Sequence, residues 1–308
     1  MENKEFNNNL INGKESGYIF LSSTCVAFII GVLMAVILAL IVSFSSVSSE
    51  EFMDSKAFFY LSNGLLQFSF VGIIFCFGKI FNKNYFKNVP LKKIKWYDYL
   101  LISLLAVCLI FGVGQLNNFF NKFLRILGLK KVSVTVPVPS SLPELLLSAI
   151  IVCLLPAFCE ELLFRGVILN HLKEYGNLFA IISSGLLFSL FHQSPLQTLH
   201  PFLTGMTFAF LVIKTGSILS SILLHFLNNL IIVLCKYFNL FQTFTFVAFI
   251  IALTIFVVVI LAYVFLLHKT EKKDEEKSKL SFRIKDFLKS YILGIILCVI
   301  VYAVEFIG

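Results

Sequence analysis

Long apolar runs constrain this chain more than any other feature of its sequence. Several separate runs are about 18 to 25 residues long, and about 20 residues of helix cross the roughly 30 Å hydrocarbon layer of a bilayer. Hydrophobic residues make up 58% of the chain and charged residues only 14%, unlike soluble globular domains. Because backbone groups in lipid must be hydrogen-bonded within their own segment, the runs should be helical. We therefore predict an all-α, polytopic integral membrane protein with about eight or nine transmembrane helices.

The apolar runs divide the chain into predicted spans and regions. The spans are 19–44, 57–78, 98–116, 142–174, 177–192, 199–213, 217–234, 243–267 and 290–307. The first run is too long for the apolar core of a signal peptide and no small-residue cleavage site follows it, so we interpret it as a span. The regions are N-terminal transmembrane helices with an interfacial segment (1–139), a core helical bundle that carries the polar motifs (140–235), and C-terminal transmembrane helices (236–308).

Lysine-rich segments set the expected orientation, because short loops with an excess of Lys and Arg stay in the cytoplasm. Segment 79–95 carries six lysines and the predicted loop 268–289 carries eight basic residues. Both are therefore predicted to be cytoplasmic, together with the N-terminus, in a multi-pass protein of the plasma membrane. The net charge of +8 fits loop lysines that face anionic lipids. The bilayer is the expected partner, and no nucleic-acid partner is predicted.

Segment 117–141 conflicts with this orientation. The span count places it outside, although it carries four basic residues. An amphipathic helix at 117–129 that lies in the membrane interface would account for part of the conflict. The alternating residues VSVTVPVP at 132–139 predict an extended segment after it.

The sequence CEELLFRG (159–166) places ionisable side chains at the end of a very apolar run. Glu161 and Arg165 are four residues apart in the acid-first order, which favours an ion pair on one helix face. Glu160 points about 100° away from Glu161, which leaves it for another role. Because ionisable residues at membrane depth are expensive and usually functional, we predict that they belong to a site.

The next helix ends in FSLFH, which places Phe188 and His192 one helical turn apart. A turn at Gly176 separates this helix from the one that carries Glu160. Glu160 lies sixteen residues before Gly176 and His192 sixteen residues after it. In an antiparallel helix pair the two side chains should therefore lie at about the same height.

A third motif, HFLNN, places His225 and Asn229 on one face of a later helix. His225 should lie about 14 Å from the turn that precedes it. The depths match only if the 142–192 hairpin extends about 10 Å further on that side. The remaining histidines have no such companions and are not predicted to belong to the site; they are His171, His200 and His268.

A carboxylate and an imidazole within a bilayer can together deprotonate a water molecule. On this interpretation Glu160 and His192 activate the water, and Asn229 with His225 offers N–H groups to the oxyanion of an attacked carbonyl. A metal site is equally possible, in which Glu160, His192 and His225 hold a divalent ion such as zinc and leave a fourth position open. Spacing does not choose between the two. The HExxH pattern of soluble zinc proteases is absent.

The three motifs together resemble one known family. EELLFR (160–165), FSLFH (188–192) and HFLNN (225–229) are similar, in order and on consecutive helices, to the EExxxR, FxxxH and HxxxN motifs of the CPBP family. That family comprises CAAX prenyl endopeptidases and bacterial proteins once grouped as Abi or bacteriocin-processing proteins. The resemblance covers roughly residues 140–235. It implies an all-helical intramembrane protease whose cavity opens to the cytoplasm.

The resemblance also implies a role for each motif residue. Glu160 would be the carboxylate that activates water together with His192. His225 and Asn229 would bind the oxyanion or a metal ion. The supporting residues would be Glu161, Arg165 and Phe188.

The expected function is therefore hydrolysis of a peptide bond in a membrane-associated peptide or lipidated protein. In bacteria such a protease would serve peptide maturation or bacteriocin self-immunity, and the abundance of Lys, Asn, Ile and Phe is typical of AT-rich bacterial genomes. One alternative is a non-catalytic scaffold that regulates a partner such as a sensor kinase. Another is a transporter, since intramembrane Glu and His also form proton relays, although no paired repeats are visible. The sequence predicts no particular oligomeric state.

Overall fold

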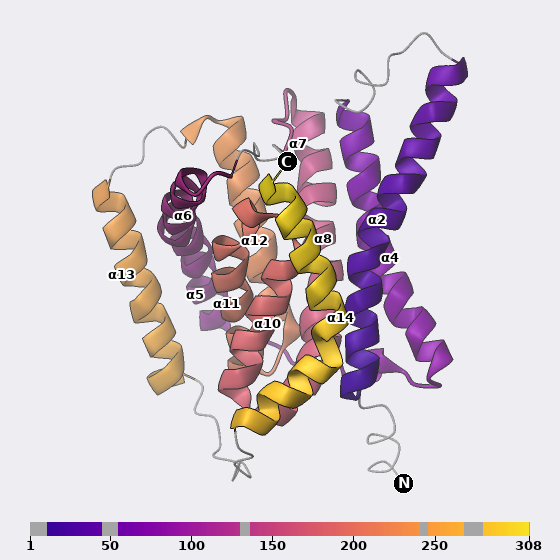
Figure 1. The fold of residues 1–308 in the computed structure, drawn as a ribbon. Helices are drawn as coiled ribbons and strands as arrows, with labels where there is room; N and C mark the ends of the chain where they lie inside the picture. Colours follow the sequence, from indigo (N-terminus) through magenta and orange to yellow (C-terminus); the bar gives the residue numbers. More distant parts are fainter. Residues whose placement is uncertain (1–10, 45–54, 130–135, 241–245, 268–279, 308) are drawn as a thin grey trace.

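The computed structural model describes residues 11–44, 55–129, 136–240, 246–267 and 280–307, and helices make up the regular structure of these residues (Figure 1). The elements are α2 (Gly13–Phe44), α4 (Lys56–Ile80), η1 (Tyr85–Asn88), α5 (Trp96–Cys108), η2 (Leu109–Val113), α6 (Gly114–Ile126), α7 (Leu142–Ser148), η3 (Ala149–Leu154), α8 (Leu155–Glu161), η4 (Leu162–Ile168), α9 (Leu169–Leu172), η5 (Lys173–Tyr175), α10 (Asn177–Phe191), η6 (Pro195–Gln197), α11 (Leu199–Thr215), α12 (Ile218–Tyr237), α13 (Phe246–Ala262), η8 (Tyr263–Leu267) and α14 (Leu280–Ile307).

Eight helices within the described ranges are long and apolar enough to cross a membrane. They are Gly13–Leu40, Lys56–Ile80, Trp96–Ile126, Leu142–Tyr175, Pro195–Thr215, Ile218–Tyr237, Phe246–Phe265 and Arg283–Phe306. The predicted span 177–192 corresponds to the 15-residue helix α10, which at 1.5 Å per residue is about 22 Å long and thus shorter than the hydrocarbon layer. The predicted all-α, polytopic membrane fold is confirmed.

The helix that carries the acidic motif is a single span from Leu142 to Tyr175. Ser141 caps its start, with its hydroxyl accepting the N–H of Glu144 at 3.4 Å. Two of its stretches, η3 and η4, have the wider hydrogen bonding of a π-helix. Pro156, which has no N–H to donate, lies just after η3. Such π segments occur frequently at functional sites.

Two local predictions concern segments next to spans. Residues 117–126, predicted as part of an amphipathic helix, lie in α6, which continues through η2 from the helix that starts at Trp96. Helix α6 is amphipathic and none of its residues is buried. Its position in the membrane interface stays a prediction. The sequence predicts that residues 280–289 are part of a loop, but they form the first turns of α14. Their basic residues therefore belong to the start of a helix and not to the connection between two helices. Residues 130–135 and 268–279, including His268, lie outside the described ranges.

Contacts between distant segments show which helix ends lie together. One end of the bundle, here called the proximal end, holds the start of α2. Three residue pairs join chain segments at this end through an ion pair or a hydrogen bond. They are Glu15 with Lys83, Pro90 with Ile218, and Tyr175 with Asp286. The opposite, distal end holds the starts of α4 and α7, where Lys56 forms an ion pair with Glu144. Figure 1 shows the same separation, with the start of α2 at the proximal end and α7 at the distal end.

Helices α10 and α11 approach each other closely because both carry a glycine at their crossing. A Cβ at Gly185 would lie 2.8 Å from the carbonyl oxygen of Phe202 and 2.5 Å from Cγ of Met206, and one at Gly205 would lie 3.1 Å from Cα of Gly185. Small residues allow membrane helices to pack backbone against backbone. The crossing also fixes the position of the Gly205 carbonyl, which takes part in the site.

We expect Gly185→Leu to destabilise the protein, because overpacking a tight contact costs about 1–3 kcal/mol. The thermal unfolding midpoint of the purified protein in detergent measures the effect. Gly64→Leu on α4 is the matched control, because nothing lies within 4 Å of a Cβ built there, and its midpoint should match that of the wild type. Equal midpoints for the two variants would contradict the close crossing.

Candidate functional site

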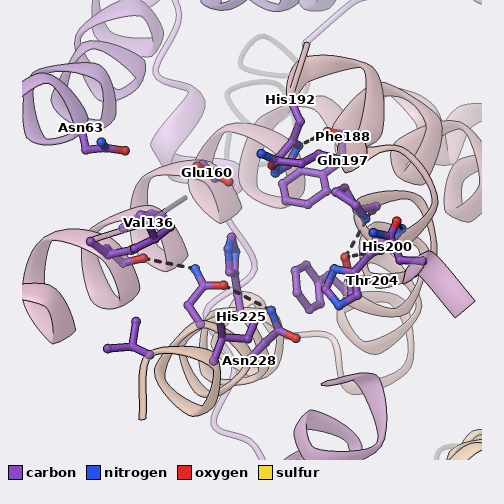
Figure 2. A pocket seen from close by; sticks show the side chains of 18 of the residues that line it. Asn63, Val136, Glu160, Phe188, His192, Gln197, His200, Thr204, His225 and Asn228 are labelled. Carbon is purple, nitrogen blue, oxygen red and sulfur yellow. Dashed lines mark hydrogen bonds between the residues drawn. The ribbon is translucent and has the colours of Figure 1, made fainter. Parts of the chain in front are cut away.

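A cavity of about 360 Å³ lies among the core helices (Figure 2). Helices α4, α8, α10, α11 and α12 contribute to its wall, together with the connection between α10 and α11. Its polar lining residues are Asn63, Gln67, Asn117, Glu160, His192, Gln197, His200, Thr204, His225, Asn228, Asn229 and Lys236. Polar side chains facing one hollow within a membrane-spanning bundle indicate a functional site.

Glu160 lies near the end of α8 and is 9% exposed. Its Oε1 accepts a hydrogen bond from Nε2 of Gln67 on α4 at 2.8 Å. The amide therefore holds the carboxylate in a defined position at the cavity wall. Figure 2 shows Glu160 facing the same space as His192 and His225.

His192 lies directly after the last residue of α10. Its Nδ1 is 2.8 Å from the carbonyl oxygen of Phe188, one turn earlier. A carbonyl oxygen only accepts, so Nδ1–H is the donor, and in the neutral ring Nε2 is the basic nitrogen. The ring also packs edge-on against Phe188, with the centroids 4.9 Å apart. The end of α10 therefore fixes both the position and the tautomer of this imidazole.

Glu161 is fully buried and joins two of the motifs. Its Oε1 accepts hydrogen bonds from Nη1 of Arg165 at 2.9 Å and from Nδ1 of His225 at 3.0 Å. Arg165 is also fully buried, and its Nη2 donates to the carbonyl oxygen of Gly205 at 2.8 Å. Removing one partner of a buried ion pair costs about 3–5 kcal/mol. Glu161 and Arg165 therefore hold each other in place, and Glu161 orients His225.

Aromatic rings enclose the Arg165 guanidinium. Its central carbon lies 4.5 Å from the ring centroid of Phe188, 5.2 Å from that of Phe208 and 5.6 Å from that of Phe164. Cation–π attraction of this kind strengthens when the pair is desolvated. Phe208 also stacks on the ring of His225 at 5.1 Å. Since Phe188 and Phe208 line the cavity, they separate it from the buried charge.

The amide motif on α12 contacts the π segment η3. Nδ2 of Asn229 donates to the carbonyl oxygen of Val152 at 3.4 Å, and Nδ2 of Asn228 donates to Oδ1 of Asn229 at 3.2 Å. Each amide nitrogen carries two hydrogens, so Asn229 keeps a second N–H for another acceptor. The hydrogen bond from Asn229 to Val152 therefore links α12 to the irregular backbone of η3.

The structure brings four residues predicted from sequence to the wall of one cavity and places two more behind it. The wall residues are Glu160, His192, His225 and Asn229, and those behind are Glu161 and Arg165. Residue counting places the acidic motif and His225 at unequal distances from the turns that precede or follow them. Because Glu161 and His225 are in contact, the condition that the 142–192 hairpin extends further is met. Glu161 positions His225, and Asn229 bonds to η3.

Sequence reasoning missed several residues of the cavity. Gln67 and Asn63 lie one turn apart in the apolar helix α4, and this polar pair was a signal that could have revealed them. The prediction that His200 lacks companions is wrong: it lines the cavity, and its backbone N–H donates to Oδ1 of Asn117 at 3.0 Å. Because α10 is short, the chain turns back within the bundle, which brings the start of α11 to the cavity.

His171 also has partners that the sequence did not reveal. Its ring nitrogens lie 2.9 Å from the hydroxyl of Tyr175 and 3.1 Å from that of Tyr291. These contacts join α9 to α14 near the proximal end, away from the cavity. His171 is therefore part of the packing between helices.

The metal-binding alternative concerns Glu160, His192 and His225, which all line the cavity. Within the described ranges, no group of three or more His, Cys, Asp or Glu side chains is placed to hold a metal ion. Glu160 is held by Gln67, and the Nδ1 atoms of His192 and His225 are bonded to Phe188 and Glu161. Bonds at Nδ1 leave Nε2 of each ring as the nitrogen that can face a water molecule or a metal ion, so the metal-bound alternative stays a prediction.

The fold and the cavity define a polytopic membrane protein with a buried polar site, and part of the chain is similar to a known family. Residues 142–231 match the family model described as Type II CAAX prenyl endopeptidase Rce1-like. The matched segment carries the three motifs, so the predicted resemblance to the CPBP family of CAAX proteases is confirmed for this segment. Neither the curated proteins nor the solved structures contain a significant match.

We expect Arg165→Met to lower the thermal midpoint in detergent strongly, because it leaves Glu161 buried without its ion-pair partner at a cost of about 3–5 kcal/mol. The double variant Glu161→Gln with Arg165→Met removes both charges and should recover part of the loss. Equal midpoints for the single and double variants would contradict the coupling between the two side chains. Thermal unfolding of all three proteins under one condition makes the comparison.

Proposed function

We propose that the protein is an intramembrane endopeptidase in which Glu160 and His192 activate a water molecule for attack on a peptide bond. The observation that carries the proposal is that both side chains line one cavity and that each has one polar atom in a hydrogen bond to another residue of the protein. Gln67 holds the carboxylate, and the Phe188 carbonyl holds the imidazole. Side chains fixed in this way can act as general bases without first losing their own conformational freedom.

The reaction needs only water and the substrate amide. Water gives a proton to Glu160 while it hydrogen-bonds to Nε2 of His192, and its oxygen bonds to the carbonyl carbon. The carbon–nitrogen bond of the tetrahedral intermediate then breaks as Glu160 returns the proton to the leaving amine. The products are a carboxylic acid and an amine, with no change in oxidation state.

The developing oxyanion needs hydrogen-bond donors on the other side of the carbonyl. Asn229 has a second amide N–H beyond the one bonded to Val152. His225, when protonated on both nitrogens, donates Nδ1–H to Glu161 and presents Nε2–H to the cavity. Removing one oxyanion donor typically costs about 10²–10³ in kcat.

The polar lining favours a peptide as the substrate. Buried amide oxygens of Gln67 and Asn228 have no hydrogen-bond partner within the described structure, and both residues line the cavity. A peptide backbone carries N–H groups that would satisfy them. The substrate class is therefore a membrane-associated peptide or a lipidated protein, whose anchor keeps it next to the bundle.

The biological setting we favour is a bacterial plasma membrane. Composition and the short connections between helices support it. Peptide maturation and bacteriocin self-immunity are the roles that suit a peptidase in this place. The metal question is tested together with activity, because a chelator separates a metal-bound water from one activated by Glu160 and His192.

Cleavage of fluorogenic, lipid-modified peptides by the purified protein in detergent tests the proposal. We expect Glu160→Gln and His192→Ala each to lower kcat by at least about 10², the lower range for loss of a general base, and we expect a chelator to leave wild-type activity unchanged. Loss of wild-type activity in chelator, restored by added zinc, would replace the metal-free mechanism. A cellular phenotype that survives both substitutions, with no cleavage, would instead support a scaffold.

Gln67→Leu tests the positioning of the carboxylate. We expect kcat to fall by about 10-fold or more, because a misplaced catalytic group loses rate, while KM changes little. Gln115→Leu on α6, outside the cavity lining, is the matched Gln-to-Leu control and should keep wild-type kcat. An unchanged kcat in Gln67→Leu would show that the Gln67–Glu160 bond has no part in the reaction.

A further inference from the structure

The cavity opens toward one end of the bundle. Val136, in the segment just before α7, and Lys236, at the last turn of α12, both line it. Gln197, in the connection after α10, lines it too and is exposed. All three lie at or toward the distal end, whereas none of the cavity's lining residues comes from the described proximal segments at 81–95, 173–177 or 214–218.

Basic residues concentrate at the other end. Twelve described Lys and Arg side chains belong to proximal segments: Lys14, Lys79, Lys83, Lys87, Lys92, Lys93, Lys95, Lys173, Lys214, Arg283, Lys285 and Lys289. Four belong to distal segments: Lys56, Lys122, Arg125 and Lys236. In the connecting sequence, 268–279 adds five lysines between two proximal helix ends, and 130–135 adds two between distal ones. The end that lacks the cavity mouth therefore carries most of the positive charge.

Lys and Arg near span ends stay in the cytoplasm, and this bias sets the orientation of multi-pass proteins. The asymmetry places the proximal end in the cytoplasm and the distal end on the other side. We propose that the cavity opens on the non-cytoplasmic side of the membrane. This orientation is opposite to the one that the family resemblance implies. Substrates would therefore reach the cavity from the non-cytoplasmic side and not from the cytoplasm.

The orientation narrows the substrate class, and this step rests on the proposed peptidase function. A cavity with a non-cytoplasmic mouth receives exported peptides, or the outer segments of lipid-anchored and membrane proteins. Prenylated carboxyl termini of cytoplasmic proteins reach only the proximal end. The water consumed in the reaction also enters from the non-cytoplasmic side, since the polar lining leads there.

Labelling of introduced cysteines with a membrane-impermeant maleimide tests the orientation in intact cells that express the full chain. Gln197→Cys samples the mouth, Val138→Cys samples a second, half-exposed distal position, and Lys93→Cys samples the exposed proximal loop. The wild type, with its seven cysteines, is the blank. We expect the two distal positions to label in intact cells and the proximal one only after permeabilisation. The reverse pattern would overturn the proposal.

Cleavage in sealed, right-side-out membrane vesicles tests the substrate class. The probe is a membrane-impermeant fluorogenic peptide added outside, with Glu160→Gln as the inactive control. We expect the wild type to cleave it equally well before and after detergent. Cleavage only after detergent would overturn the orientation while leaving the peptidase in place. Outside labelling of Gln197→Cys with no cleavage in either state would leave the orientation standing and overturn the peptidase, and with it the substrate class.

Discussion

The buried ion pair between Glu161 and Arg165 is the interaction on which the rest of the site depends. Both side chains are fully buried, and charges without a partner in such surroundings are too costly to keep. The pair therefore fixes the faces of the central helix, and its remaining hydrogen bonds reach two other helices, at His225 on α12 and at the Gly205 carbonyl on α11. Three helices are held around one cluster, and the reactive side chains take their positions from it.

Irregular helix geometry complements this cluster. The central span changes to π-helical hydrogen bonding before and after Glu160 and Glu161, and Asn229 donates to a carbonyl of the first π segment. Helix α10 ends within the bundle at His192, whose imidazole bonds back to the Phe188 carbonyl. Glu160 and His192 thus lie next to points where the backbone departs from a regular α-helix.

Much of the site was predictable because membrane helices make polar residues conspicuous. Glu160, His192, His225 and Asn229 stand out in apolar runs, and simple counting from the turn at Gly176 places Glu160 and His192 at one height. Gln67 could not be assigned in this way, because its helix lies far away in the sequence and only packing brings it to Glu160. The sequence does not place His200 in the site, because it does not reveal that α10 is too short to cross the membrane.

The sequence by itself determined the all-helical membrane fold, the three motifs and the uneven distribution of basic residues. These follow from local properties, since hydrophobicity, helical periodicity and loop charge are read within short stretches of chain. The tertiary structure alone decided that Glu161 orients His225, that Gln67 holds Glu160, and that the cavity opens at the end poor in basic residues. The reason is that these features depend on which helices pack together, and such contacts join residues separated by tens of positions along the chain.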